Sequence, residues 1–248
     1  METQACCTDT PLSSQQQSVW ADVVAQAVTG ELIGAMNYRT LAEICDLASE
    51  KAEASEHAER EAAHAQMFRR LGKSIGTEIR SDAGAPYWSR IRAAFVRRAT
   101  RGDRTGCFVI QEVMLESFAV ASYGRIARIA PPAIATTFAA IAAEEREHVE
   151  HAVGLLRGTR DRDADAFDAM VKTLHAEVMT TLAEMVARED PQGHCGLCSG
   201  TCVKEALPAV GLCTSELRGA SLRQYMQTLD AIGVPGDASL QWVAQLPV

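Results

Sequence analysis

The 248-residue chain has few aromatic residues, no long apolar run and no alternating pattern that would predict a strand. Phe, Trp and Tyr make up 5% of it, whereas 47% of its residues are hydrophobic and alanine is abundant. Small aliphatic side chains favour closely packed helices, and the apolar content is sufficient for one substantial core. No apolar run reaches the roughly 20 residues that a transmembrane segment needs. The composition therefore predicts an all-α protein without a transmembrane segment.

Basic residues are fewer than acidic residues. The 24 Lys and Arg residues stand against 32 Asp and Glu residues, which gives a net charge of −8. An acidic chain is repelled by phosphate backbones, so we expect no nucleic-acid partner. The N-terminal segment METQACCTDTPLSSQQQ is polar and lacks an apolar signal core. We therefore expect a disordered lead-in over residues 1–17 and a cytoplasmic protein.

Apolar residues recur at helical spacing along most of the chain, and glycine and proline divide it into segments. This pattern predicts an all-α bundle with helices over residues 18–48, 50–71, 87–100, 103–130, 132–158, 165–188 and 203–232. We expect a bundle domain over 18–188, a Cys-rich loop over 189–213 and a C-terminal helical part over 214–248 that packs on the bundle.

Two of the six histidines follow a glutamate by three positions, in the pairs Glu61/His64 and Glu145/His148. Residues three apart on a helix lie one turn apart on the same side, so both side chains can reach one ion. Chance alone gives about half a match in such a composition. Two solvated helix faces are therefore an equally good interpretation of these pairs alone.

Two further glutamates are placed opposite the pairs. Glu31 precedes Glu61 by 30 residues, and Glu116 precedes Glu145 by 29. The midpoint of the second interval falls beside a Pro-Pro pair, where a helix must end, so an antiparallel hairpin would bring Glu116 level with its partner. The first interval repeats this arrangement about residue 46. The spacing predicts two helical hairpins joined by a long crossover.

These residues match the di-metal carboxylate site of ferritin-like bundles, which has one Glu opposite each Glu-x-x-His. Glu116 stands in the apolar segment CFVIQEVMLESFAV, where an unpaired buried carboxylate would be very costly. A protonated or salt-bridged core glutamate is the alternative. Carboxylate and imidazole donors favour two Fe ions, with Mn as the alternative. The predicted ligands are Glu31, Glu61, His64, Glu116, Glu145 and His148.

Around these ligands the chain resembles the aldehyde-deformylating oxygenases, also called aldehyde decarbonylases, of the ferritin-like superfamily. The resemblance covers roughly residues 18–158 and rests on the segments GELIGAMNYRTLAEI, EREAAHAQMF, CFVIQEVMLESFAVASY and EEREHVEH. It implies a ferritin-like bundle, a di-iron pair held by the same six residues and O2 as co-substrate. It also implies cleavage of a fatty aldehyde into formate and a hydrocarbon one carbon shorter.

The resemblance also suggests residues beside the metals. Tyr38 and Tyr123 match family tyrosines near the metals, with ordinary interior packing as the alternative. Glu112 and His151 each lie one turn from a predicted ligand. Each could be an extra ligand, a partner of a ligand, a pocket residue or a solvent-facing side chain. The family has a serine and an aromatic residue at these two positions. A more polar substrate of specialised metabolism therefore stays open.

Four of the eight cysteines lie close together, at Cys195, Cys198, Cys202 and Cys213. Their glycine-containing loop could wrap thiolates around zinc, and the spacing is not a standard iron–sulfur run. Thiol–disulfide chemistry and unliganded thiols are the alternatives. The basic segments 68–70 and 95–104 could dock an acidic electron donor, such as a ferredoxin served by its reductase, or could be solvated faces.

Three functions are compatible with these patterns. The favoured hypothesis is an O2-activating non-haem di-iron oxygenase that acts on an aldehyde or a related small molecule in a buried pocket. A metal-storage or peroxide-scavenging ferritin-like protein is the second. The third is a non-catalytic binding or assembly protein in which the Cys-rich segment is the functional part. The patterns do not distinguish a monomer from an oligomer.

Overall fold

The computed structural model describes residues 12–186 and 202–248, and every regular element within these ranges is a helix. This result confirms the predicted all-α class. None of the helices in the described ranges combines the length and the apolar character that crossing a bilayer requires.

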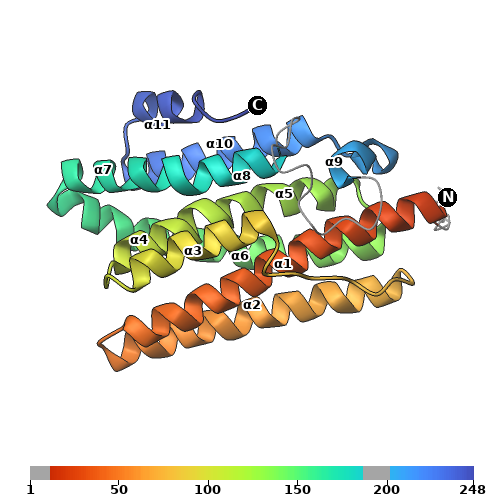
Figure 1. Cartoon of the computed structure of the whole chain (residues 1–248), viewed down its shortest axis with the longest axis horizontal. Coiled ribbons are helices and arrows are strands. Elements are labelled where there is room, and N and C mark those ends of the chain that lie inside the picture. The colour runs from red at the N-terminus through yellow and green to blue at the C-terminus, as the bar shows by residue number, and fades with distance from the viewer. Residues whose placement is uncertain (1–11, 187–201) are drawn as a thin grey trace, which may run out of the picture.

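Two helical hairpins form the centre of the molecule. Helices α1 (Ser14–Ile44) and α2 (Ala48–Ser74) make the first hairpin, and α5 (Glu116–Ile129) and α6 (Pro132–Arg162) make the second. The crossover between them contains α3 (Pro86–Ala99), α4 (Arg104–Phe108) and the π-helical segment η1 (Val109–Leu115), which runs directly into α5. Figure 1 shows α1 and α2 side by side along one edge of the bundle.

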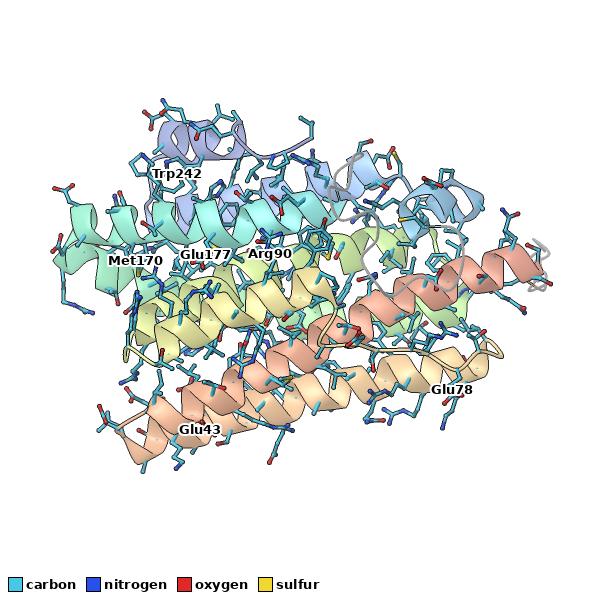
Figure 2. The ribbon with its side chains drawn as sticks, viewed as in Figure 1. Glu43, Glu78, Arg90, Met170, Glu177 and Trp242 are labelled. Carbon is cyan, nitrogen blue, oxygen red and sulfur yellow. The ribbon has the colours of Figure 1, made fainter. Side chains whose placement is uncertain are left out.

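The rest of the described chain lies mostly on the side of the bundle away from α2 (Figure 1). Its elements are α7 (Ala164–Leu174), the π segment η2 (His175–Met179), α8 (Thr180–Val186), α9 (Val203–Ala206), the 3-10 turn η3 (Leu207–Val210), α10 (Thr214–Ile232) and α11 (Gly236–Val243). Helix α10 lies against α5 and α6. Trp242 of α11, labelled in Figure 2, has its ring centroid 6.0 Å from that of His175, so α11 is tied to η2. The expected C-terminal helices are present.

Local signals explain where the helices begin and end. The side chain of Ser13 accepts a hydrogen bond from the Gln16 amide, and the Gln16 side chain accepts one from the Ser13 amide. This reciprocal cap starts α1 at Ser14, inside the segment that we expected to be a disordered lead-in. Pro132 occupies the first turn of α6, where a missing amide hydrogen has no cost. Gly233, with φ +105°, closes α10 in the left-handed conformation.

Three aromatic residues form a cluster between the two hairpins. The ring of Phe68 from α2 lies 4.8 Å from that of Phe138 in α6 and 5.4 Å from that of Tyr123 in α5. Phe138 and Tyr123 are 5.3 Å apart and nearly perpendicular, which is a favourable aromatic geometry. This cluster joins α2, α5 and α6 next to the buried polar residues described below. It therefore sets the spacing of the helices that carry them.

We expect Phe138→Ala to lower the free energy of unfolding by about 3–5 kcal/mol, because Phe138 is fully buried and its removal leaves a cavity. Leu155→Ala is the control on the same helix, since Leu155 is 47% exposed, and it should change stability by less than about 0.5 kcal/mol. Urea denaturation followed by circular dichroism measures both. Equal losses would contradict this account of the core.

Candidate metal centre

The two hairpins bring six acidic and imidazole side chains to one level in the interior. Helix α1 contributes one, α2 two, the first residue of α5 one and α6 two. Each is at most 3% exposed to solvent. They are the six predicted ligands, Glu31, Glu61, His64, Glu116, Glu145 and His148.

The six residues form two overlapping groups. In each group the ligand atoms lie within 4.8 Å of one another. The first group adds Glu31 and His64 to a shared pair of carboxylates, and the second adds Glu116 and His148. The shared pair is Glu61 and Glu145. Two adjacent cations bridged by two carboxylates would fit this arrangement.

Both histidines direct Nδ1 towards the carboxylates. In His64, Nδ1 lies 2.9 Å from Glu145 Oε1 and 3.2 Å from Glu31 Oε2. In His148, Nδ1 lies 3.0 Å from Glu145 Oε2 and 3.6 Å from Glu61 Oε1. The same nitrogen of each ring is therefore available to a cation between these oxygens.

Several polar atoms of this cluster are buried and make no hydrogen bond of normal geometry, although His64 and His148 lie within 3.0 Å of Glu145. These atoms are Oε1 of Glu61, both carboxylate oxygens of Glu145 and both ring nitrogens of His148. Buried polar atoms are nearly always hydrogen-bonded, so such a concentration at one place fits a pair of cations. The donor set of carboxylate oxygens and imidazole nitrogens is one that Fe and Mn accept.

The electrostatics of the cluster lead to the same conclusion. Burial raises the pKa of Glu61 and of Glu116 well above the usual range, and the neighbouring Glu145 raises both further. Burial also raises the pKa of Glu145 itself. Without cations, these carboxyl groups would retain protons, because packing several negative charges into a low-dielectric interior is unfavourable. Divalent cations would remove that cost.

The two tyrosines that the sequence singled out both donate hydrogen bonds to carboxylates. Tyr123 donates to Glu31 Oε1 over 2.5 Å, and Tyr38 donates to Glu112 Oε1 over 2.6 Å. Burial raises the pKa of both phenols, so both keep their protons and act as donors. Tyr123 thereby holds the orientation of Glu31.

The sequence analysis did not identify a polar chain that ends on Glu116. Gln111 Nε2 donates to Glu116 Oε1 over 2.6 Å, and Asn37 Nδ2 donates to Gln111 Oε1 over 2.7 Å. Arg92 donates to Asn37 Oδ1 over 3.2 Å. In an α-helix, a residue five positions away points about 140° from its reference. The wider turn of η1 brings Gln111 onto the same side as Glu116.

The exposed Glu144 is a further contact residue that the sequence analysis did not identify. Its Oε2 lies 3.0 Å from Nε2 of His64, the ring nitrogen that faces away from the carboxylates. A carboxylate on the outer nitrogen of a ligand histidine fixes the ring orientation and increases its basicity. Position alone could not reveal this contact, because Glu144 neighbours Glu145 but points in another direction.

Glu112 and His151 occupy different surroundings. Glu112 is fully buried in η1 beside the cluster, and its Oε2 has no hydrogen-bond partner. Burial raises its pKa to about 8, although the hydrogen bond from Tyr38 acts in the opposite direction. His151 is exposed, and its Nε2 lies 3.3 Å from Glu53 Oε1. His151 therefore lies outside the buried groups.

An apolar cavity of about 180 Å³ reaches the cluster. Glu31, Glu61 and Glu116 line its polar end. The rest of its wall is mostly apolar and includes Val23, Ala27, Leu115, Phe118, Ile126 and Leu182. This cavity corresponds to the expected pocket, and its mostly apolar lining leads to the acidic residues.

The cysteine segment is only partly described. Cys202 is half-buried and lines the apolar cavity, and Cys213 is exposed at the start of α10. Neither forms a disulfide. Cys195 and Cys198 lie outside the described residues, so the zinc site at this segment stays a prediction.

Comparisons with known proteins agree with this architecture. A family model described as long-chain fatty aldehyde decarbonylase matches residues 13–185. Among solved structures, the chain is similar to a Synechococcus protein described as having aldehyde deformylating oxidase activity, with a TM-score of 0.76 and 18% sequence identity. The match covers 94% of this chain and 98% of that one, which confirms the predicted ferritin-like bundle. No curated protein matches in sequence.

The raised pKa of Glu112 predicts a pH dependence of stability in the metal-free protein. Between about pH 5 and pH 8, the folded state keeps a proton on Glu112 that the unfolded state has lost. The free energy of unfolding therefore falls as pH rises, by about 1.4 kcal/mol per pH unit for one such group. We expect Glu112→Gln to make this decline less steep by up to that amount.

Urea denaturation in the presence of a chelator, repeated across this pH range, measures the slope. Glu59→Gln is the matched control, because Glu59 is exposed on α2, and it should keep the wild-type slope. Parallel stability curves for Glu112→Gln and the wild type would show that Glu112 does not hold the proton.

Proposed function

The chain belongs to the long-chain fatty aldehyde decarbonylase family, and on that premise we propose that it is a non-haem di-iron oxygenase that cleaves an aldehyde bound in the apolar cavity. Membership of this family indicates an enzyme that resembles the aldehyde-deformylating oxygenases. Its products would be formate and a hydrocarbon one carbon shorter than the aldehyde, with O2 as co-substrate. The observation that carries the proposal is the convergence of four buried glutamates and two histidines at one end of that cavity.

Each of the two groups would hold one ion. Glu31 and His64 would bind the first, Glu116 and His148 the second, and the shared carboxylates of Glu61 and Glu145 would bridge them. Four carboxylates balance the charge of two divalent cations. Iron is the ion that we favour and manganese is the alternative. Bound iron would supply the redox chemistry that activation of O2 requires.

Hydrogen bonds from neighbouring side chains would hold these ligands in position. Tyr123 orients Glu31, Gln111 orients Glu116, and Glu144 fixes the outer nitrogen of His64. Such partners commonly change metal affinity or activity by about 10–100-fold when they are removed. The two ends of the site are thus oriented by residues from different helices.

The shape and lining of the cavity support an apolar substrate. Its aliphatic wall would accept an alkyl chain, and its acidic end would place the carbonyl group next to the ligands. One observation favours a more polar substrate as the second candidate. Arg218 lines the cavity from α10, and its Nη1 is buried without a hydrogen-bond partner. An aldehyde that carries an anionic group would supply that partner.

Glu112 and Tyr38 would act as a proton store. Cleavage of the aldehyde with reduction of O2 consumes protons and electrons, which must come from outside the substrate. In the metal-free protein Glu112 holds its proton at neutral pH, and its unpartnered Oε2 is buried one turn from Glu116. Tyr38 donates to the other oxygen and so keeps the carboxyl group oriented.

The electron donor that we propose is an acidic protein such as a ferredoxin, kept reduced by its reductase. Three arginines in residues 95–104 are already paired with acidic side chains, namely Arg97 with Glu177, Arg98 with Asp103 and Arg104 with Glu50. That segment carries less free positive charge than its sequence suggests. Each segment keeps one exposed arginine outside these pairs, Arg70 in residues 68–70 and Arg101 in residues 95–104, so both remain docking candidates.

Anaerobic reconstitution with Fe(II) tests the proposal. We expect at least two ions per chain. With O2, a reductant and a long-chain aldehyde, we expect formate and the shortened hydrocarbon, detected by gas chromatography. Glu116→Ala should lower turnover by at least about 100-fold, because it removes a ligand and the partner of Gln111. Glu150→Gln is the control, since Glu150 is exposed on α6. Consumption of peroxide without any organic product would favour the peroxide-scavenging alternative.

Gly34 provides a test in which none of the six ligand residues is substituted. A Cβ at Gly34 would lie 2.6 Å from Glu61 Oε2 and 3.2 Å from Gln111 Nε2, so Gly34→Ala must displace the bridging carboxylate. We expect Fe(II) affinity to fall by about 10–100-fold, measured by competition with a chelator. Gly124→Ala on α5 is the matched control, because open space surrounds that position. Equal affinities in the two variants would contradict a bridging role for Glu61.

A further inference from the structure

A third group of potential metal ligands lies outside the buried cluster. It comprises Glu53 and His57, one turn apart on α2, and His151 on α6. Their ligand atoms lie within 4.8 Å of one another, as in the two buried groups. Unlike those groups, this one is partly exposed to solvent.

A surface ion pair does not account for the whole group. His151 Nε2 lies 3.3 Å from Glu53 Oε1, which would satisfy these two residues alone. The ring of His57 stacks parallel to that of His151, with centroids 6.3 Å apart, and its Nδ1 is buried without a hydrogen-bond partner. A cation shared by the three side chains would engage one ring nitrogen of His57.

The group lies between solvent and the buried cluster. The ring centroid of His57 is 4.6 Å from that of His148 and 4.9 Å from that of Tyr38. A cavity of about 630 Å³ is lined by His57, Tyr38 and Glu53, together with polar residues that include Glu50 and Asp103. Its described lining residues do not overlap with those of the apolar cavity.

The two cavities differ in what they can admit. A hydrated cation loses favourable interactions with water in an apolar cavity, so the cavity that would hold the aldehyde is a poor path for metal. Two carboxylates of the second cavity, Glu50 and Asp103, are paired with arginines. Glu53, next to His57 and His151, is the lining carboxylate that would attract a cation. This second cavity ends at rings that touch the buried cluster.

We propose that Glu53, His57 and His151 bind a third divalent transition-metal ion, on the polar route by which ions reach the buried pair. Two imidazoles and one carboxylate suit Fe(II), Co(II) and Zn(II), with water completing the coordination. Partial exposure allows the ion to exchange with solvent. Binding at this site is independent of the proposed function, whereas its role in metal uptake rests on the di-iron pair proposed above.

Titration of the metal-free full-length protein with Co(II) under anaerobic, reducing conditions tests the site. By equilibrium dialysis, we expect the wild type to bind one more ion per chain than His151→Asn or Glu53→Gln. Glu150→Gln, next to His151 and exposed, should bind as many ions as the wild type. Diffraction at the cobalt edge should show a peak between the three side chains that is missing in His151→Asn.

Equal numbers of bound ions in the wild type and His151→Asn would overturn the site. Failure of the proposed di-iron centre would give a different result. Glu116→Ala would then bind as many ions as the wild type, whereas His151→Asn would still bind one ion fewer. For the uptake role, we expect Fe(II) incorporation in stopped-flow mixing to slow by about tenfold in His151→Asn. An unchanged rate would overturn that role.

Discussion

Four glutamates buried in the middle of a helical bundle are the constraint on which the rest of this structure depends. Each helix of the two hairpins places at least one acidic side chain where a core would normally have an aliphatic one. Burial and mutual repulsion raise the pKa of Glu61 and Glu116, so the metal-free fold tolerates them only as protonated groups. A pair of divalent cations would relieve this cost. The buried glutamates therefore make the metal-free fold less stable than an aliphatic core would. Binding of cations would explain why they are there.

The surrounding core compensates through rigid packing and oriented hydrogen bonds. Phe68, Tyr123 and Phe138 pack edge to face between the hairpins, and the same Tyr123 donates its hydroxyl hydrogen to Glu31. One residue thus links the apolar core to the acidic cluster. On the other side, the polar chain from Asn37 through Gln111 reaches Glu116. Because these donors come from α1, α5 and η1, the ligand geometry depends on how the helices pack rather than on any one of them.

Much of this arrangement could be predicted from the sequence, because it follows from the helical repeat and from the spacing of the glutamates in the two hairpins. The Pro-Pro pair and the nearly equal Glu-to-Glu separations predict two hairpins whose residues meet at one level, and the six side chains do converge. The same periodicity could not predict Gln111, since a regular α-helix directs it away from Glu116 and only the π turn of η1 brings the two together. His57 and Glu144 escaped prediction because their contacts cross between helices and depend on rotamers. The Ser-x-x-Gln capping box at the start of α1 is visible in the sequence. It starts α1 at Ser14, before the end of the lead-in that we expected over residues 1–17.

The two cavities give the buried cluster two sides with different chemistry. The apolar one meets it at Glu31 and Glu116, and the polar one approaches through Tyr38 and His57. A reaction that combines a water-insoluble chain with O2, protons and electrons benefits from this separation, because water admitted with the polar reactants would otherwise reach the alkyl pocket. Glu112 stands at the boundary, hydrogen-bonded to Tyr38 on the polar side and one turn from Glu116 on the other. A carboxyl group that keeps its proton near neutral pH in the metal-free protein is suited to that position, because it adds no negative charge beside the cluster while it holds the proton.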